Sequence, residues 1–204
     1  MVNFVCFKRV IPFAVLAFGV TAARADVLYD NLLAASDGSD SIQSLGTLYD
    51  SFSVGGTSVD LNTISVSLIN PNASAGQFDI GIYFDNATTP GAVFATGFAP
   101  DAIVGQTTTI VNFTVNGTLQ LNANTRYWIG LSADPTVGSG VDWNWSLDNT
   151  GTGVANEFFS NGNGTFPNSD GPYQMQIGAT PAPEPATMAL LGVGVLGLLK
   201  RRKK

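Results

Sequence analysis

Short segments rich in valine, isoleucine, threonine and aromatic residues recur along the middle of this chain, each bounded by glycine, asparagine, aspartate, proline or serine. This pattern is typical of β-strands joined by turns. Residues 64–68 and 80–84 place apolar side chains at alternate positions, which predicts strands with one buried face. The segments expected to form strands are residues 27–33, 47–54, 61–69, 77–84, 107–115, 126–133, 141–147 and 173–177.

The same region lacks any long run of strong helix formers with a 3.6-residue period, and it shows no repeat of solenoid or propeller length. Residues 26–180 are a suitable length for one domain with its own core. We therefore expect an all-β fold, an antiparallel β-sandwich of jelly-roll or Ig-like type.

The first 25 residues have the three parts of a secretory signal peptide. Lys8 and Arg9 form a cationic stretch, residues 10–22 are apolar, and Ala23-Arg24-Ala25 is an A-x-A cleavage site. We expect cleavage after Ala25, so that an exported mature chain begins at Asp26.

The end of the chain, residues 181–204, has the composition of a membrane tail. Prolines at 181, 183 and 185 predict an extended spacer that joins neither a helix nor a sheet. Residues 186–199 are uncharged, and about 14 helical residues span roughly 21 Å, less than the ~30 Å hydrocarbon core, so we expect a thin transmembrane helix. The basic residues 200–204 should stay in the cytoplasm and leave the domain outside.

The tail resembles the PEP-CTERM sorting signal of Gram-negative bacteria. Pro183-Glu184-Pro185 is followed by a Gly-rich apolar stretch and by Lys200-Arg201-Arg202, in the order of that signal. The resemblance implies an exosortase as the processing partner, a precursor in the inner membrane, and release or transfer to the cell surface or to an exopolysaccharide matrix such as a biofilm.

Four short segments of the mature region, 28–31, 127–131, 143–145 and 173–177, combine aromatic residues with strand-forming ones. In the order of these segments the region is similar to the surface domains called choice-of-anchor domains, which are attached to interchangeable anchors; the similarity implies no particular activity.

The charge of residues 26–180 is one-sided, with 14 acids against a single base, Arg126, a net charge of −13. Such a surface disfavours nucleic acid and anionic lipid as partners and favours cations. The chain has no histidine, and its one cysteine, Cys6, lies in the signal peptide. Zinc sites of His and Cys, Ser-His-Asp triads and Cys-His nucleophiles are therefore excluded. We expect no enzymatic activity, and a fold held by core packing, by a metal, or by both.

Large aromatic residues suggest one kind of binding site, for sugar. Trp143 and Trp145 are two residues apart and would share one face of a strand, and Trp128 is a third candidate. If these rings point outward they form a platform that stacks on sugar rings, and if they point inward they belong to the core.

Acidic residues in loops suggest a second kind of site, for calcium, because Ca²⁺ takes six to eight oxygen ligands. The candidate ligands are Asp37, Asp40, Asp134, Asp142 and Asp148. None has the spacing of an EF-hand, and Asx turns that cap their own loops are the alternative. If these residues only cap their own loops, we expect the domain to have no cofactor.

Two further residues have weaker signals. Glu157, the one glutamate of residues 26–180, lies in an apolar stretch, but a glycoside hydrolase needs a second carboxylate facing it. Arg126 should pair with one of the many acids. Taken together, the sequence predicts an exported, non-enzymatic protein with a structural or adhesive role at the cell surface; a calcium-assisted carbohydrate-binding module is the alternative.

Overall fold

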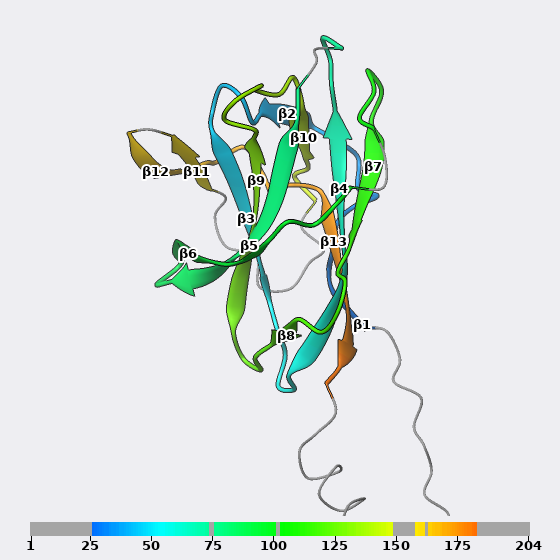
Figure 1. The fold of residues 1–204 in the computed structure, drawn as a ribbon, viewed down its shortest axis with the longest axis vertical. Helices are drawn as coiled ribbons and strands as arrows, with labels where there is room; N and C mark the ends of the chain where they lie inside the picture. The colour runs from blue at the N-terminus through cyan, green and yellow to red at the C-terminus, as the bar shows by residue number, and fades with distance from the viewer. Residues whose placement is uncertain (1–25, 74–75, 101–102, 149–157, 162, 183–204) are drawn as a thin grey trace, which may run out of the picture.

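The computed structural model describes residues 26–73, 76–100, 103–148, 158–161 and 163–182, and these form strands without any helix. Two antiparallel sheets face each other, so the predicted β-sandwich is confirmed (Figure 1). No helix in this part of the chain could span a membrane. The predicted signal peptide, the sorting tail with its transmembrane helix, and Glu157 lie outside the described residues.

We call the two layers sheet A and sheet B. Sheet A has the order β1 (Asp26–Asp30), β13 (Met175–Pro181), β4 (Val59–Ile69), β10 (Asp142–Trp145) and β2 (Gly38–Ser41), and β7 (Thr109–Thr114) and β8 (Gln120–Leu121) also pair with β4. Sheet B has the order β12 (Gly164–Pro167), β11 (Phe158–Asn161), β3 (Thr47–Ser53), β9 (Arg126–Ala133), β5 (Phe78–Asn86) and β6 (Thr89–Thr96).

Strand β4 organises sheet A because it pairs with four other strands. Along one edge it pairs with β13 and then, at Leu68 and Ile69, with β10; along the other it pairs with β8 and then with β7. Its alternating pattern is used as predicted: Ile64, Val66 and Leu68 are fully buried in the core. Ser65 and Ser67 point to the other face and bond Asn112 and Asn144.

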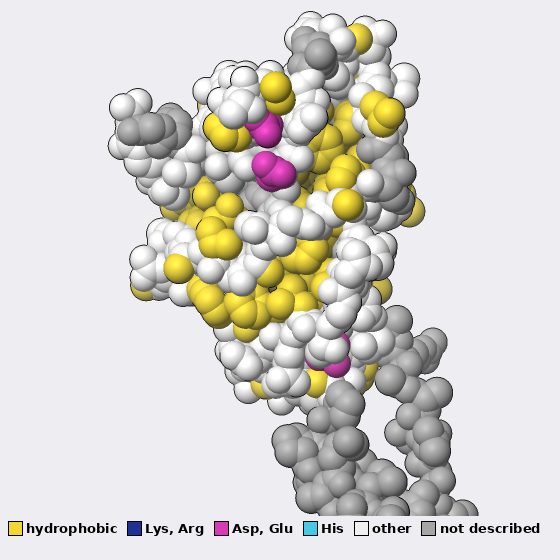
Figure 2. Space-filling view, viewed as in Figure 1, with side chains coloured by type: hydrophobic (Ala, Val, Ile, Leu, Met, Phe, Trp, Pro, Cys, Tyr) yellow, Lys and Arg dark blue, Asp and Glu magenta, His cyan; other side chains and the backbone are white. Residues whose placement is uncertain are grey.

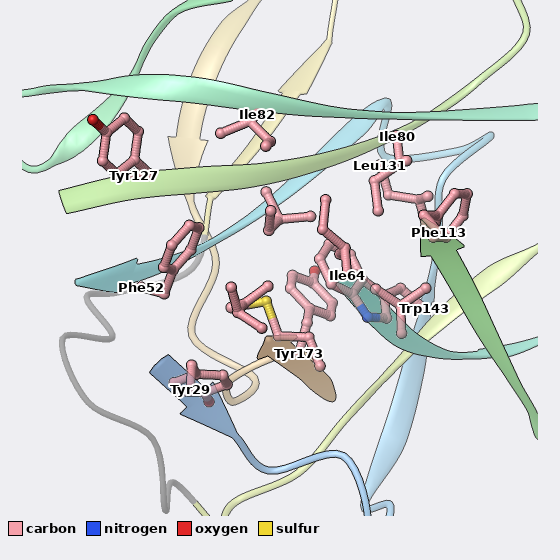
Figure 3. Packing of buried hydrophobic residues seen from close by; sticks show 14 of the residues in the cluster. Tyr29, Phe52, Ile64, Ile80, Ile82, Phe113, Tyr127, Leu131, Trp143 and Tyr173 are labelled. Atoms are coloured by element: carbon pink, nitrogen blue, oxygen red, sulfur yellow. The ribbon is translucent and has the colours of Figure 1, made fainter. Parts of the chain in front are cut away.

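The core lies between the sheets and is rich in aromatic rings (Figure 3). Near one end Trp143 stacks on Tyr173, with ring centroids 4.6 Å apart, and toward the other Phe52 stacks on Tyr127. Aliphatic side chains from both sheets, including Ile64, fill the space between these pairs. The buried hydrophobic side chains of the described residues therefore form one continuous core.

All eight predicted strands are present, β9 with the predicted ends and the others with at least one end shifted. Among the described residues five further strands were missed: β2, β6, β8, β11 and β12. The missed strands are short or lack an apolar alternation. Strand β2 reads Gly-Ser-Asp-Ser and β6 begins Thr-Pro-Gly. These segments lie at or near sheet edges and form strands because a neighbouring strand pairs with them. Local composition does not indicate this tertiary effect.

Both ends of the domain lie together at one end of the sandwich. Asp26 pairs with Ala179, and Pro181 pairs with Val59 as the last residue of β13. The N–H of Ala182 then donates to the carbonyl of Ser58 at 3.0 Å. The expectation that the spacer from Pro181 onward joins no sheet is wrong at its first residue, because a proline at a strand end gives up only its own donor.

The outer face of sheet B carries a tight aromatic contact over a glycine. The rings of Tyr49 and Tyr83 meet edge to face, with centroids 5.1 Å apart, above Gly130. A Cβ atom on Gly130 would lie 2.5 Å from Cε2 of Tyr83 and 2.8 Å from Cε1 of Tyr49. A residue without a side chain is therefore needed at this position.

We predict that Gly130→Ala lowers the free energy of unfolding by about 1–3 kcal/mol, because the added methyl overpacks the two rings. The matched control is Gly105→Ala, where nothing lies within 4 Å of an added Cβ. Urea denaturation of both variants measures the difference. Equal stability of Gly130→Ala and the parent chain would contradict this packing.

A second prediction concerns alkaline pH. Burial raises the pKa of Tyr49 from 10.0 to about 12, and burial also raises the pKa of Tyr83. Between pH 10 and 12 the folded state therefore keeps a proton that the unfolded chain releases, and stability should fall as the pH rises through this window.

Denaturation midpoints measured between pH 8 and pH 12 test this, and Tyr49→Phe should lose less stability than the parent chain over the same range. Parallel curves for the two proteins would show that Tyr49 does not contribute to the alkaline loss.

Candidate functional site

An open cleft of about 990 Å³ lies at the end of the sandwich that carries β2 and the start of β10. Its walls come from the turn between β2 and β3, from the loop that joins β9 to β10, and from Ser160 of β11. Residues 26 and 182 lie at the opposite end of the sandwich (Figure 1). We call this feature the distal cleft.

The distal cleft is lined mainly by hydroxyl, amide and backbone groups. Its polar side chains include those of Ser41, Gln43, Thr47, Asn72, Ser132, Asp134, Thr136, Ser139, Asp142 and Ser160. Gln43 joins two of the walls, since its Oε1 accepts a 2.8 Å hydrogen bond from the N–H of Ser139. The residues that line the cleft include no aromatic ring.

The loop between β9 and β10 is held by Asp134. The Oδ1 atom of Asp134 accepts hydrogen bonds from the N–H groups of Thr136 and Val137 and from the hydroxyl of Thr136. These hydrogen bonds, led by the Thr136 hydroxyl, lower the pKa of Asp134. Asp134 thus forms an Asx turn that shapes one wall of the cleft. This is the alternative to calcium binding that the sequence analysis gave for this residue.

Asp142 is the second carboxylate of the distal cleft. Partial burial raises its pKa, the nearby Asp40 adds to that effect, and hydroxyl groups of Ser39 and Ser41 oppose it. The Ser39 hydroxyl donates to Oδ2 of Asp142 at 3.3 Å. A carboxylate in the lining of a cleft of hydroxyls can accept hydrogen bonds from a ligand with several hydroxyl groups.

The remaining calcium candidates lie elsewhere. Asp37 accepts the N–H of Leu147 at 2.9 Å, and the N–H of Asp148 donates to Ser146. Asp40 accepts from the hydroxyl of Tyr173 at 2.6 Å and from Asn168 at 2.7 Å. Of the five, Asp134 and Asp142 line the distal cleft, and Asp40 lies near Asp142. The described residues contain no group of three or more carboxylates, histidines or cysteines placed to hold a metal.

The tryptophans do not form a sugar platform. Trp143 is 0% exposed, and its indole N–H donates to the carbonyl of Gln174 inside the core. Trp145 is partly buried, with its ring over Gly38 of the neighbouring strand β2. The expectation of a stacking face on Trp143 and Trp145 is corrected, because the shared face of the pair is the inner one.

Trp128 lies on the outer face of sheet B but is also 0% exposed, with Phe158 packed edge to face against it. Its indole N–H donates to Oδ1 of Asp85 at 2.8 Å. Arg126 approaches the same atom at 4.0 Å, in line with the expected pairing of Arg126 with an acid. The sugar-binding expectation for Trp128 is therefore corrected too.

Sequence reasoning missed most of the lining of the distal cleft, namely Ser41, Gln43, Thr47, Asn72, Ser132, Ser139 and Ser160. The sequence carried no signal for this grouping. It follows from the antiparallel pairing of β3 with β9, which places the start of β3 and the end of β9 at the same end of sheet B. The processing residues Ala23, Ala25, Pro183, Glu184, Pro185, Lys200, Arg201 and Arg202 lie outside the described residues.

Comparison with known proteins bears on the end of the chain. No curated protein matches the chain. Residues 181–204 match the model of the PEP-CTERM protein-sorting motif, and the match begins at the last residue of β13. The chain therefore carries a PEP-CTERM protein-sorting motif, which indicates an exported protein that passes through a membrane-anchored precursor and exosortase processing to the cell surface.

Proposed function

We propose that the released domain is a structural or adhesive component of the extracellular matrix that binds exopolysaccharide in the distal cleft. The observation that carries the proposal is the position of the cleft. The sorting motif starts at one end of the sandwich and the cleft opens at the other, so a ligand can reach the cleft while the precursor is still anchored.

The chemistry of the cleft supports a polyol ligand. Hydroxyl, amide and carboxylate side chains both donate and accept hydrogen bonds, as the hydroxyl groups of a sugar require. The volume of about 990 Å³ is at the upper end of the range for small-molecule sites and could hold a few sugar units. The net charge of −13 on residues 26–180 favours a neutral or cationic polysaccharide over an anionic one.

The proposed role is binding, without catalysis. Residues 26–180 have neither histidine nor cysteine to serve as a general base or nucleophile. In the distal cleft the two carboxylates differ in their partners, because Asp134 accepts hydrogen bonds from its own loop while Asp142 accepts one from Ser39 of β2.

A calcium-assisted version of the same function is the second candidate. One observation favours it: Asp134 and Asp142, both proposed as calcium ligands from the sequence, line the same cleft. Serine hydroxyls and backbone carbonyls nearby could add oxygen ligands. Under this version, polysaccharide binding requires the ion.

The proposal predicts that variants of the distal cleft lose affinity for the producing strain's own exopolysaccharide. Asp142→Asn removes one acceptor and should weaken binding about ten- to a hundredfold, the loss expected for a hydrogen bond to a charged group. Ser132→Trp fills the cleft and should abolish binding. Isothermal titration calorimetry of residues 26–182 with the purified polysaccharide measures both effects.

The matched controls lie away from the cleft. Asp26→Asn makes the same chemical change at the opposite end of the sandwich, and Thr114→Trp adds the same ring on exposed β7. Both should bind as the parent domain does. Equal losses in controls and cleft variants would remove the cleft from the proposal, and loss of binding in a calcium chelator would select the calcium-assisted version.

The export route gives a separate prediction. Intact mass of the surface-released protein should show an N-terminus at Asp26 and a C-terminus before residue 186, because both processing sites flank the folded domain. Replacing Lys200, Arg201 and Arg202 with serine should leave the precursor unprocessed, since the basic stop sets its topology. A released form that retains residues 186–199 would rule out cleavage at the motif.

A further inference from the structure

Residues 180–182, which we call the latch, are attached to sheet A on one side only. The first two pair with the start of β4, and the N–H of Ala182 donates to the carbonyl of Ser58 at 3.0 Å. Among the described residues, strand β1 on the other side of β13 pairs no farther along it than Ala179, just after a register shift between Gly178 and Ala179. A strand end that only one neighbour holds can open locally while the rest of the domain stays folded.

The closed latch is nevertheless well packed. Ala182 is 7% exposed, and Ser58 is fixed in turn by the loop between β8 and β9, because the Ser58 hydroxyl accepts the N–H of Ala123 at 3.1 Å. Figure 2 shows acidic but no basic side chains on the viewed face at this end of the domain, so contact with anionic lipid would not hold the latch in place. The domain itself keeps the latch closed.

The latch overlaps the sorting motif. The match to the PEP-CTERM motif begins at Pro181, so the first two residues of the motif are the last two of the latch. Beyond them only residues 183–185 precede the apolar stretch at 186–199, and three residues span at most about 10 Å. An enzyme that processes a peptide binds an extended segment through its backbone groups, as a sheet binds an added strand. With the latch closed, the motif offers just three residues for such binding ahead of the apolar stretch.

We propose that the latch must open before the exosortase can process the tail. Pairing with β4 and binding to the enzyme are mutually exclusive, because the N–H of Ala182 donates either to Ser58 or to the enzyme. Processing therefore proceeds through the open latch alone, and its rate follows the population of the open form. The pairing of one strand end in sheet A thus controls when the precursor is released.

A disulfide across the latch tests this proposal in the full precursor. Asp60 and Thr180 lie directly opposite each other in an antiparallel pair, in which Cα atoms are about 4.5–5.5 Å apart, a separation that a disulfide can bridge. Both residues are only partly buried, and the chain beyond residue 25 has no cysteine of its own. The double variant Asp60→Cys with Thr180→Cys should form this bond after export and slow the conversion of precursor to released protein at least about tenfold.

Pulse-labelling in the producing strain, with gels that separate precursor from released protein, measures the rate of processing. The matched control, Ser65→Cys with Gln176→Cys, joins the same two strands at another directly opposite pair, on the far side of the register shift. This control should be processed at the parent rate. Adding a reductant to membranes that hold the locked precursor should restore its processing.

A second pair of variants acts in the other direction and needs no disulfide, so it decides the question if the cysteine pair impairs folding. Thr180→Gly weakens the latch and should speed processing about two- to fivefold, the effect expected of a glycine in a strand. Thr109→Gly makes the same change on β7 at the opposite end of sheet A, and it should be processed at the parent rate.

A locked precursor that is processed at the parent rate overturns the proposal, as does a Thr180→Gly precursor that is no faster than Thr109→Gly. A parent precursor that is not processed removes the export route and the latch together. The latch rests on the proposed export route but involves no polysaccharide, so its failure and the failure of binding in the distal cleft are distinguished by separate measurements.

Discussion

The pairing of β4 on both of its edges is the interaction on which the rest of the structure depends. One eleven-residue strand holds β13 and β10 along one edge and β8 and β7 along the other, so segments from most of the chain meet on it. Beyond the direct pairing of β4 with β10, the backbone of Gln174 links the two strands. Its carbonyl accepts the N–H of Ser67, and its N–H donates to the carbonyl of Asn144. Because residues 26–180 contain no cysteine, this ladder and the core beneath it must supply the stability that disulfides supply in many exported domains.

The alternation of side chains in β4 and β5 made the core predictable, because a period of two places every second residue on the same face. The pattern could not tell which face of β10 is inward. Trp143 and Trp145 share a face in either case, and only the stacking of Trp143 on Tyr173 decides that the face belongs to the core. Strands β2, β11 and β12 have little apolar alternation in their sequences. They form because the backbone of a neighbouring strand pairs with them, which is a tertiary effect.

The distal cleft was less predictable than the fold. Two of its residues, Asp134 and Asp142, were singled out as acids in loops, but the residues that give the cleft its polar character are serines, Gln43 and Asn72 from separate turns. Such residues are common in every turn of this chain, so their types indicate nothing. These residues lie together because of the direction and order of their strands. That arrangement depends on the pairing of β2 with β10 and of β3 with β9, which the sequence alone does not reveal.

The pairing of β13 with β1 and β4 determines where the sorting motif leaves the domain. Strand β13 runs to Pro181, and the N–H of Ala182 donates to the carbonyl of Ser58, so the first two residues of the sorting motif are attached to sheet A. Only residues 183–185 separate it from the apolar stretch at 186–199, and three residues span at most about 10 Å. In a precursor with residues 186–199 in the membrane, as proposed, such a short connection would hold the β1–β13 end of the domain toward the membrane. The distal cleft at the other end would then be directed outward, and the position of one strand end would determine which part of the surface a ligand meets first.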